Sequence, residues 1–366
     1  MMDNSFIALG LMSGTSLDGI DASIIKSDGE NNLEIIDNKY LIYPDEFKNR
    51  LSKFIQNIEN KMDIEKNIGT YKSLERDLTL HHSKIAKNII DENESKIHLV
   101  GFHGQTIIHK PFDGYSIQMG DASLLSQLLK EKVIYNFRAN DIKNSGEGAP
   151  LTPIYHKLLI KKLEMNYPKL ILNIGGISNY TYCLKDEIKA KDIGPGNVLI
   201  DEYLKKTRGI NYDKNGDIAL SGNINQDIIN QFYEHEFYNV KEKHSYDRKE
   251  FDFSFVKGLE FEDAVATLTF FTALIISNNI KRNFKNEIEI ILCGGGRKNS
   301  TLVKHIKSLL NYKIKLIDEF NIDGDFIESQ AFAYLSIRSY LKKPISYPTT
   351  TNVTSPITGG EIEINY

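Results

Sequence analysis

The stretch Leu9–Ile25, LGLMSGTSLDGIDASII, sets glycines and small hydroxyl residues between two apolar runs. The run Phe6–Met12 is continuous, as in a strand buried on both faces, and Ile20–Ile25 has the composition of its partner after a turn. We therefore predict a β-hairpin at the start of the fold. The turn carries more hydroxyl and carboxyl groups than a hairpin requires, so an ordinary surface turn and a ligand-binding loop both remain open at this point.

Length and composition indicate a globular protein of two domains. The chain has 366 residues, well above the usual domain length of about 100–150 residues. Apolar residues make up 41% and charged residues 26%, as in globular proteins. The net charge is -4, whereas a nucleic-acid-binding protein usually carries an excess of basic residues, so we expect no nucleic-acid partner. An anionic ligand would need backbone amides or a metal ion to supply the positive field.

Cysteine content and apolar segments argue against a secreted or membrane protein. Cys183 and Cys293 have no second cysteine or histidine at zinc-site spacing, so neither a disulfide framework nor a zinc site is predicted. The first residues lack the charged start and apolar core of a signal peptide. Phe270–Ile276, the most apolar segment, has polar flanks and contains a threonine. We expect a buried helix there, a cytoplasmic protein and no membrane partner.

Strand-like and helix-like segments alternate along the chain, which is typical of an α/β fold. Helices are predicted behind Pro44, along an apolar stripe from Ile64 to Ile89, over Val198–Lys206, Phe261–Phe284 and Phe326–Leu341, and after a cap at Asn299 or Ser300. Further strands are predicted at Leu99–Phe102, Lys169–Ile174, Ile288–Cys293 and Glu361–Tyr366, with Pro344–Pro356 as a loop.

Three glycine-rich turns follow predicted strands. Ser13-Gly14 and Gly175-Gly176 each join two strands, and Gly294–Gly296 joins a strand to a helix. No Walker pattern occurs, and the triple glycine fails the dinucleotide pattern because Asn299 occupies the place of the third glycine. Two hairpins of this kind could bind a polyphosphate through backbone amides, and the triple glycine could admit a base or ribose close to the backbone.

Six motifs, in order along nearly the whole chain, resemble those of the anhydro-N-acetylmuramic acid kinase family. They are Gly10–Asp21, His103–Thr106, Gly148–Leu151, Asn173–Gly176, Asp192–Asn197 and Cys293–Gly296. The resemblance implies an ATP-dependent kinase that opens 1,6-anhydro-N-acetylmuramic acid with water and phosphorylates the freed oxygen. The product would be N-acetylmuramic acid 6-phosphate, formed in the recycling of peptidoglycan sugar. The resemblance also implies a homodimer.

The fold that the resemblance implies is α/β, the two-domain actin-like ATPase (ribonuclease H-like) fold of the actin, hexokinase and sugar-kinase superfamily, with the active site in the cleft between the domains. We expect residues 1–135, together with about 344–366, to form the N-terminal domain with the first phosphate hairpin. Residues 136–343 would then form the C-terminal domain with the second hairpin, the catalytic aspartate and the adenosine motif.

The resemblance implies that the glycine-rich turns bind ATP together with Mg²⁺. Amides and hydroxyls of the first hairpin can donate to phosphoryl oxygens, and Asp18 or Asp21 could hold Mg²⁺ through water, with the choice between them open. Such a loop can suffice without a lysine clamp, because phosphoryl transfer depends mainly on positioning and charge neutralisation. The residues assigned to the nucleotide are Ser13, Gly14, Thr15, Ser16, Leu17, Asp18, Gly19, Ile20, Asp21, Gly175, Gly176, Gly194, Gly196, Asn197, Gly294, Gly295, Gly296 and Asn299.

Asp192 is the general base that the resemblance implies. Opening the anhydro bridge needs water to attack the anomeric carbon, and a carboxylate within hydrogen-bond reach can take the proton of that water. Without the resemblance, an aspartate before Gly-Pro-Gly-Asn is more typical of a turn or a helix cap. Arg297 and Lys298, beside the triple glycine, are interpreted as solvated surface charges.

Polar residues from several motifs are assigned to the sugar, although each could instead be a structural hydrogen-bonding group. They are His103, Gln105, Arg138, Asp141, Thr152 and Glu328. Arg138 is the expected partner of the lactyl carboxylate, because a planar guanidinium matches a carboxylate in two bonds. The chain departs from the family pattern at Asn136, Ser145 and Ser329. Asn136 replaces an aspartate and cannot form the same ion pair with Arg138.

Two alternatives remain beside the leading hypothesis. One is a different sugar kinase of the same superfamily, in which Asp192 would deprotonate a free hydroxyl of the sugar. The other is a non-kinase actin-like ATPase, such as a chaperone-like or filament-forming protein, which would hydrolyse ATP slowly without sugar.

Overall fold

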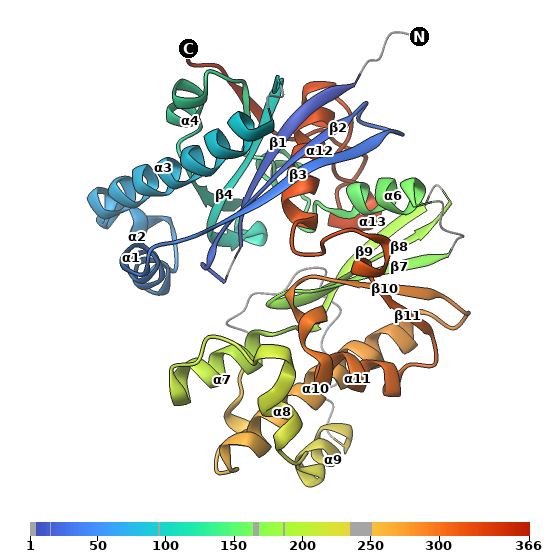
Figure 1. Cartoon of the computed structure of the whole chain (residues 1–366). Helices are drawn as coiled ribbons and strands as arrows, with labels where there is room; N and C mark the ends of the chain where they lie inside the picture. The colour runs from blue at the N-terminus through green and yellow to red at the C-terminus, as the bar shows by residue number, and fades with distance from the viewer. Residues whose placement is uncertain (1–4, 15, 94–95, 164–167, 186, 235–250) are drawn as a thin grey trace. The chain divides into compact units, whose positions relative to one another are not determined.

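The computed structural model describes residues 5–14, 16–93, 96–163, 168–185, 187–234 and 251–366. The chain divides into two compact units (Figure 1). Unit 1 comprises Met1–Met165 and Phe326–Tyr366, and unit 2 comprises Asn166–Asp325.

Unit 1 is built on a seven-stranded mixed sheet. Its strands are β1 (Phe6–Ser13), β2 (Gly19–Ser27), β3 (Leu33–Ile42), β4 (Leu99–Lys110), β5 (Tyr115–Met119), β6 (Val133–Tyr135) and β12 (Glu361–Glu363). The order is β12-β6-β4-β1-β2-β3, and β5 pairs with the outer part of β4. β1, β2 and β3 form an antiparallel meander, whereas β4 runs parallel to both β1 and β6. The hairpin predicted from Leu9–Ile25 is confirmed as the antiparallel pair β1 and β2 of this sheet.

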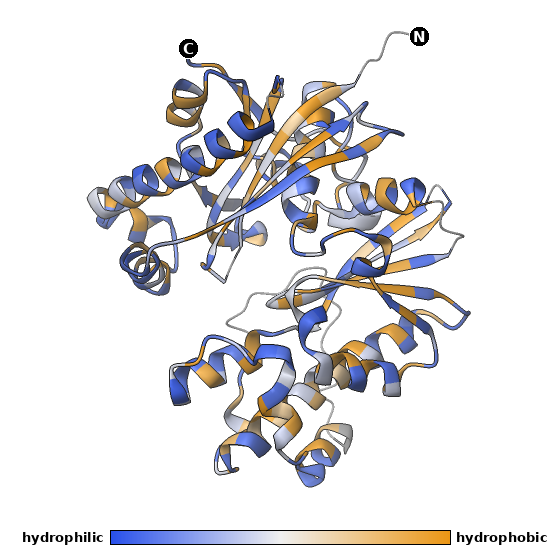
Figure 2. Ribbon diagram, in the orientation of Figure 1, coloured by the Kyte–Doolittle hydropathy of each residue, from blue (hydrophilic) through white to orange (hydrophobic). Residues whose placement is uncertain are grey.

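Helices cover the sheet of unit 1. They are α1 (Asp45–Gln56), α2 (Lys61–Lys66), α3 (Ile68–Asn93), α4 (Ala122–Leu129), α5 (Ala139–Lys143), α6 (Pro153–Lys162), α12 (Ile327–Tyr340) and α13 (Pro348–Thr351). The apolar stripe of α3, which includes Leu74, Leu78 and Ile85, is fully or almost fully buried in one cluster with Leu9, Leu11 and other strand residues. Hydrophobic residues recur along α3 between hydrophilic ones (Figure 2), as expected for an amphipathic helix on a sheet.

α12 packs directly against the middle of this sheet because two glycines leave room for its backbone. Gly10 on β1 and Gly101 on β4 lie opposite each other in the parallel register. A Cβ atom at Gly10 would lie 1.9 Å from the carbonyl oxygen of Ser329, and one at Gly101 would lie 2.2 Å from that of Phe332. Any larger residue at either position would push the helix away from the strands.

Unit 2 repeats the arrangement on a smaller scale. Its five strands are β7 (Lys169–Ile174), β8 (Ile177–Leu184), β9 (Glu187–Pro195), β10 (Glu289–Cys293) and β11 (Lys313–Leu316), in the order β11-β10-β7-β8-β9. Again the first three strands form an antiparallel meander and the next two run parallel to the first. Two sheets with one topology confirm the predicted α/β class and agree with the two-domain, actin-like fold.

The helices of unit 2 are α7 (Val198–Arg208), α8 (Asp217–Ser221), α9 (Gln226–Glu234), α10 (Phe261–Asn283) and α11 (Ser300–Leu309). α10 and α11 share one apolar cluster with the inner strands, and α10 also packs with α7 and α8 in a second cluster. By length and composition α10 could cross a membrane, but 78% of its most apolar window is buried inside the protein. The prediction of a buried helix here is confirmed.

The unit boundaries differ from the predicted domain boundaries. The structure assigns residues 136–165 and 326–343 to unit 1, whereas we expected them in the C-terminal domain. The physical reason is packing that is distant in sequence. α12 lies on β1, β2 and β4, and α6 contacts β3 and α12. Hydrogen bonds from Lys161 to Asn31, and from Lys162 to the carbonyl of Leu33, tie the end of α6 to the meander.

Candidate active site

The first predicted phosphate hairpin joins β1 to β2 through residues 14–18. Thr15, which was assigned to the nucleotide, lies outside the described residues. Leu17 adopts a left-handed backbone with φ 59° and is buried, and its amide donates to the carbonyl of Gly14 at 3.2 Å. Ser16 is exposed at the tip, whereas Ile20 is fully buried in the core. The loop can thus present backbone groups and the Ser16 hydroxyl, but not the side chains of Leu17 or Ile20.

The Ser13 hydroxyl is already occupied by protein partners. It donates to the side-chain oxygen of Gln105 at 2.7 Å and accepts from the Tyr43 hydroxyl at 2.9 Å. All three residues are 1% exposed. Burial raises the pKa of Tyr43 above its ordinary value, so the phenol stays protonated and remains the donor. Ser13 and Gln105 therefore stabilise the base of the hairpin, and neither the Ser13 hydroxyl nor the Gln105 side-chain oxygen can contact a ligand without breaking these hydrogen bonds.

The two candidate Mg²⁺ aspartates have different settings. Asp18 follows the turn, forms an ion pair with Lys48, and has 46% of its side chain exposed. Asp21 is on β2, opposite Met12 and Tyr40. Among the described residues, no group of three or more His, Cys, Asp or Glu side chains is placed to hold a metal ion. Mg²⁺ does not require such a group, because it commonly takes one or two carboxylates and completes its shell with waters and substrate phosphates.

The second hairpin, Gly175-Gly176 between β7 and β8, is closed by main-chain bonds. The amides of Gly196 and Val198 donate to the carbonyl of Gly176 at 2.8 and 3.1 Å, and that of Asn197 donates to Gly175 at 2.8 Å. A Cβ at Gly196 would lie 2.2 Å from the Gly175 carbonyl. Because both turn carbonyls are used, the amides of Gly175 and Gly176 are the groups that this turn can offer to an anion.

Asp192 lies on β9, near this turn, beside a bulge. Asp192 pairs with Asn179 of β8, and the next pair is Ser178 with Gly194, so Ile193 is the extra residue. Bulges of this kind re-aim neighbouring side chains and are frequent beside active sites. Gly194 follows the bulge with φ 138°, and a Cβ there would lie 2.6 Å from the Ile275 side chain. Asp192 itself is partly exposed, as a proton acceptor for a bound substrate must be.

A polar row extends from Asp192 across the sheet. Asn179 lies opposite Asp192, and Asn173 of β7 lies opposite Asn179. Directly opposite residues share a face, with Cβ atoms about 4.5–5.5 Å apart. All three are partly exposed, and the row ends at buried Cys293, whose thiol contacts Asn173. The row therefore connects the predicted base to the start of the triple glycine.

The triple glycine is fixed against the end of β7. Gly294 has φ 77°, and a Cβ there would lie 2.2 Å from the Asn173 side-chain oxygen. A Cβ at Gly296 would lie 2.3 Å from the Ile174 side chain. Asn299, one of the two predicted cap residues, is the N-cap of α11, because its side-chain oxygen accepts from the amide of Leu302 at 2.9 Å.

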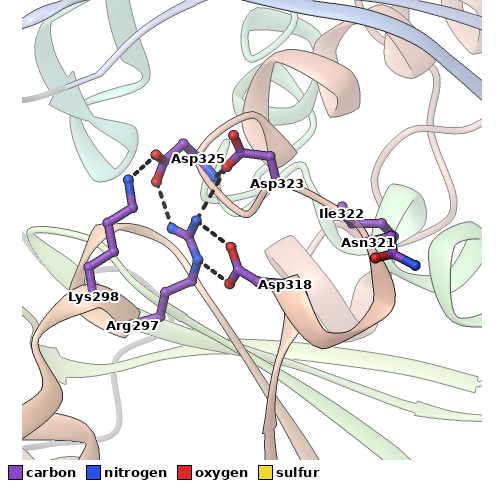
Figure 3. Close-up of a pocket in the computed structure, with 7 residues that line it drawn as sticks. All are labelled: Arg297, Lys298, Asp318, Asn321, Ile322, Asp323 and Asp325. Carbon is purple, nitrogen blue, oxygen red and sulfur yellow. Dashed lines mark hydrogen bonds and ion pairs between the residues drawn. The ribbon is translucent and has the colours of Figure 1, made fainter.

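Arg297 differs from its interpretation as a solvated charge. Its side chain is only 2% exposed and forms ion pairs with Asp318, Asp323 and Asp325, whereas Lys298 is 59% exposed and pairs with Asp325. Figure 3 shows this network, with Asn321 and Ile322 apart from it. These residues line a hollow of about 360 Å³ in unit 2. The sequence interpretation was wrong for Arg297 because its three partners lie more than twenty residues further along the chain.

His103 and Arg138, both assigned to the sugar, contact each other in unit 1. Two nitrogens of Arg138 lie 2.9 and 3.3 Å from Nε2 of His103, and Nδ1 of His103 is 2.8 Å from the carbonyl of Gly104. Burial, with the charge of Arg138, holds the pKa of His103 well below its ordinary value. The ring is therefore neutral, with its proton on Nδ1 and its Nε2 accepting from Arg138. Arg138 also donates to the carbonyl of Gly148 at 2.7 Å.

The other residues assigned to the sugar have varied surroundings. Asp141 is 1% exposed, and its two oxygens accept from the amide of Gly148 and the Thr351 hydroxyl, both at 2.6 Å. Asp141 therefore holds the loop that positions Gly148, not a ligand. Thr152 is at the start of α6 and Glu328 is in the first turn of α12, and both are partly exposed.

Asn136, which replaces the aspartate of the family pattern, forms a hydrogen bond with a residue other than Arg138. It adopts φ 54°, and its side-chain amide donates to Glu361 at 2.6 Å. Asparagine tolerates this left-handed backbone better than most residues. The guanidinium of Arg138 is instead oriented by His103 and Gly148. The loss of the aspartate thus does not leave Arg138 unsupported.

Sequence reasoning missed Tyr43, Asn173, Asn179 and Arg297 as parts of the candidate site. For the two asparagines a signal was present, since both interrupt otherwise β-prone strands beside the Gly-Gly turn. Tyr43 carried no such signal, because its contact with Ser13 depends on how the meander brings residue 43 back to the hairpin.

Comparisons with known proteins agree with the motifs. The family model described as anhydro-N-acetylmuramic acid kinase matches residues 6–364. A protein of that name from Pelagibacter ubique (strain HTCC1062) is 47% identical over the full length of both chains. One from Zymomonas mobilis is 37% identical, covering 97% of this chain and 99% of its own. Among solved structures, the chain is similar to component A of the (R)-2-hydroxyglutaryl-CoA dehydratase of Acidaminococcus fermentans. The alignment covers 92% of this chain and 100% of that one, at 9% identity and a TM-score of 0.49. The chain belongs to the anhydro-N-acetylmuramic acid kinase family.

Proposed function

We propose that this protein is an ATP-dependent kinase that hydrolytically opens 1,6-anhydro-N-acetylmuramic acid and phosphorylates it to N-acetylmuramic acid 6-phosphate. The family match over residues 6–364 carries this proposal. The partly exposed Asp192, beside a bulge and next to the Gly175-Gly176 turn, supports it chemically.

Asp192 acts as the general base in this proposal. Water attacks the anomeric carbon, the bond from that carbon to the bridging oxygen breaks, and Asp192 takes the proton of the water. The bridging oxygen forms a bond to the γ-phosphorus of ATP, and the bond from that phosphorus to ADP breaks. The sugar, ATP and water are thereby converted to the 6-phosphate, ADP and a proton. The separate acid that many glycosidases use is unnecessary, because the phosphoryl group captures the departing oxygen.

The glycine-rich turns bind the nucleotide in this proposal. Amides around Gly14 and at Gly175-Gly176 meet the phosphates, and the Gly294–Gly296 turn accepts the adenosine. Asp18 or Asp21 would hold Mg²⁺ through water. When bound, Mg²⁺ neutralises charge on the phosphates. Since the Ser13 hydroxyl is already bonded within the protein, the main chain and Ser16 are the stronger candidates for direct phosphate contacts.

Arg138 binds the lactyl carboxylate in this proposal. It is held by the neutral imidazole of His103 and the carbonyl of Gly148, so part of its guanidinium is oriented in advance. Thr152 and Glu328, both partly exposed, supply further sugar contacts. Gln105 and Asp141 act indirectly, through Ser13 and the Gly148 loop respectively. Replacing Arg138 by Ala should raise KM for the sugar far more than KM for ATP.

Labelled water tests the reaction. The protein is incubated with ATP, Mg²⁺ and the anhydro sugar in ¹⁸O-water, and the products are separated quickly and analysed by mass spectrometry. The proposal requires label on the anomeric carbon of the sugar phosphate and none in the transferred phosphate. Label in inorganic phosphate without sugar phosphate would indicate an ATPase instead. Phosphorylation of ordinary N-acetylmuramic acid, but not of the anhydro sugar, would favour a kinase acting on a free hydroxyl.

A homodimer and a cytoplasmic location complete the proposal. Both come from the family resemblance and the sequence composition. Light scattering after size-exclusion chromatography tests the first, because a monomer at micromolar concentration would contradict it. Cell fractionation of the native host tests the second.

A further inference from the structure

We propose that Arg297 is a positioning residue for the nucleotide, because it fixes the triple-glycine turn to the segment Asp318–Asp325. This inference rests on the proposed assignment of that turn to adenosine. The turn and its partners all belong to unit 2, and Figure 3 shows the side chains involved.

Every donor of the Arg297 guanidinium has an acceptor. Nε and one terminal nitrogen bind both oxygens of Asp318 at 2.7 and 3.0 Å, and the same terminal nitrogen reaches Asp323 at 3.3 Å. The other terminal nitrogen donates to Asp325 at 2.6 Å and to the carbonyl of Gly294 at 3.1 Å. A guanidinium has five N–H groups, and these are five bonds. Arg297 is therefore fully satisfied within the protein and is not itself a ligand contact.

The carbonyl of Gly294 makes this network relevant to the nucleotide. It belongs to the first residue of the turn, and the opposite side of Gly294 is packed against Asn173 and Ile174 of β7. The turn is thus held between the sheet and Arg297. The Gly294 carbonyl also accepts from the main-chain amide of Arg297 at 3.2 Å, and the guanidinium bond adds the connection to Asp318–Asp325. Nucleotide-binding backbone must be placed within a fraction of an ångström to be effective, so this connection affects binding without touching the ligand.

The surrounding residues are fitted to this guanidinium. A Cβ at Gly324 would lie 2.5 Å from Nε of Arg297, so glycine at that position gives the guanidinium its space. The hydrogen bond from Arg297, with the charge of Arg297, lowers the pKa of Asp318 despite partial burial. Burial raises the pKa of Asp325, but bonds from Arg297 and Lys298 outweigh it and leave that pKa lowered. The carboxylates are thus charged at neutral pH, as the network requires.

Lys298 provides a matched control. It is adjacent in sequence, carries the same charge and pairs with Asp325, but it is 59% exposed and makes no bond to the glycine turn. Loss of a solvated ion pair of this kind has little effect. A difference between the two residues therefore reports on the bond network and not on net charge.

The test compares Arg297→Lys with Lys298→Met in the full chain. Arg297→Lys cannot make five bonds, but it should fold because it keeps the charge and a similar volume. Arg297→Met is a second, harsher variant, because Asp318 and Asp323 would lose their arginine partner and Asp325 would keep only Lys298. Equilibrium binding of Mg·ATP without sugar should weaken at least about tenfold in Arg297→Lys, which corresponds to about 1.4 kcal/mol. KM for the sugar should stay within about twofold, and Lys298→Met should leave both values unchanged. Hydrogen exchange in the peptide spanning residues 294–299 should be faster in Arg297→Lys alone.

Two outcomes would overturn the inference. One is unchanged ATP affinity in Arg297→Lys, whether or not exchange at the turn increases. The other is equal weakening of ATP and sugar binding, which would indicate general destabilisation. Because ATP binding is measured without sugar, a wild-type protein that binds ATP but fails to phosphorylate the anhydro sugar would refute the proposed function alone. A wild type that binds no ATP would refute both.

Discussion

The two β-hairpins that we assign to the phosphates are built in opposite ways. The hairpin of unit 1 has a longer turn with side chains, in which Ser13 is bonded to Gln105 and Tyr43, and Asp18 to Lys48. The hairpin of unit 2 is two glycines, closed by the amides of residues 196–198. One turn is therefore supported by side chains and the other by main chain. The two turns assigned to the phosphates are thus stabilised by different kinds of contact. Mutations in them should therefore differ in their effects on stability and on ATP binding.

The largest effect on catalysis is expected at Asp192, in unit 2 with the Gly175-Gly176 turn. Asp192→Asn keeps the shape but removes the proton acceptor, so kcat should fall by about 100- to 10,000-fold with Tm nearly unchanged. Steady-state kinetics and a thermal melt measure the two quantities. The matched control is Asp217→Asn, an exposed aspartate of α8 in the same unit, which should keep wild-type activity. Near-normal turnover in Asp192→Asn would refute its role as base.

Acid should distinguish the units that carry the hairpins. Burial lowers the pKa of His82 and of His109 to about 4 and that of His156 to about 3, and all three are in unit 1. Unfolded histidine titrates near pH 6.5, so between pH 6.5 and 4 the unfolded chain binds protons that the folded unit does not. The free energy of unfolding of unit 1 therefore decreases as pH falls, by about 1.4 kcal/mol per pH unit for each such histidine.

Unit 2 should respond mainly at lower pH. Among its residues 168–185, 187–234 and 251–325, His305 is the one histidine, half-buried with a lowered pKa. Asp318 and Asp325 have lowered pKa values, so their contribution to stability is present above pH 4 and lost as pH falls through those values. Hydrogen exchange at pH 6.5, 5 and 4, corrected for intrinsic rates, should show α3 and β4 losing protection before α10 and β10. His82→Leu should reduce this difference, and simultaneous loss in both units would contradict the prediction.

Glycine substitutions should separate folding from binding at the two turns. Gly196→Ala forces a Cβ to within 2.2 Å of the Gly175 carbonyl, so it should lower the free energy of unfolding by about 1–3 kcal/mol. At Gly14 the nearest atom to an added Cβ is the Ser16 hydroxyl at 3.9 Å, so the fold should tolerate Gly14→Val. A bulky residue there should instead obstruct phosphate, lowering kcat/KM for ATP with Tm unchanged. Intact ATP affinity and turnover in Gly14→Val would remove the first hairpin from the ATP site.

The smallest effects on catalysis should come from the serines of the first hairpin. Ser13→Ala removes the Ser13 bonds to the side-chain oxygen of Gln105 and to the Tyr43 hydroxyl, both buried, and should cost about 1–3 kcal/mol of stability. Ser16→Ala, at an exposed position, should leave stability unchanged and raise KM for ATP a few-fold. Chemical denaturation and initial-rate kinetics measure these values. The reverse pattern, with Ser13→Ala affecting only ATP, would mean that Ser13 contacts phosphate directly.

Much of the fold was predictable because apolar runs mark its central strands. β1, β7 and α10 match the predicted ranges closely. β3 was missed because its alternating polar residues lie on a partly exposed strand. The single helical stripe from Ile64 to Ile89 is two helices, α2 and α3, since the chain breaks at Asn67, which caps α2. Pro344–Pro356, predicted as a loop, contains the short helix α13.

The candidate site was predictable to the extent that it is local in sequence. Glycine turns, the capping Asn299 and the aspartate before Gly-Pro-Gly can each be recognised in a few residues. The occupation of Ser13 and the burial of Arg297 could not, because their partners are distant along the chain. The strand predicted at Leu99–Phe102 continues to Lys110, so His103 and Gln105 lie within β4 and not after it.

Gly10 shows how a signature residue can mislead a genetic screen. Gly10 begins the most recognisable motif, which suggests a nucleotide contact. The space that a side chain would need at this position is, however, occupied by the main chain of α12. A Gly10 variant would therefore lose activity by producing less folded enzyme, and its remaining molecules would bind ATP normally. Screens that score only activity would count Gly10 as part of the ATP site, whereas activity divided by the amount of soluble protein would assign it, with Gly101, to the scaffold.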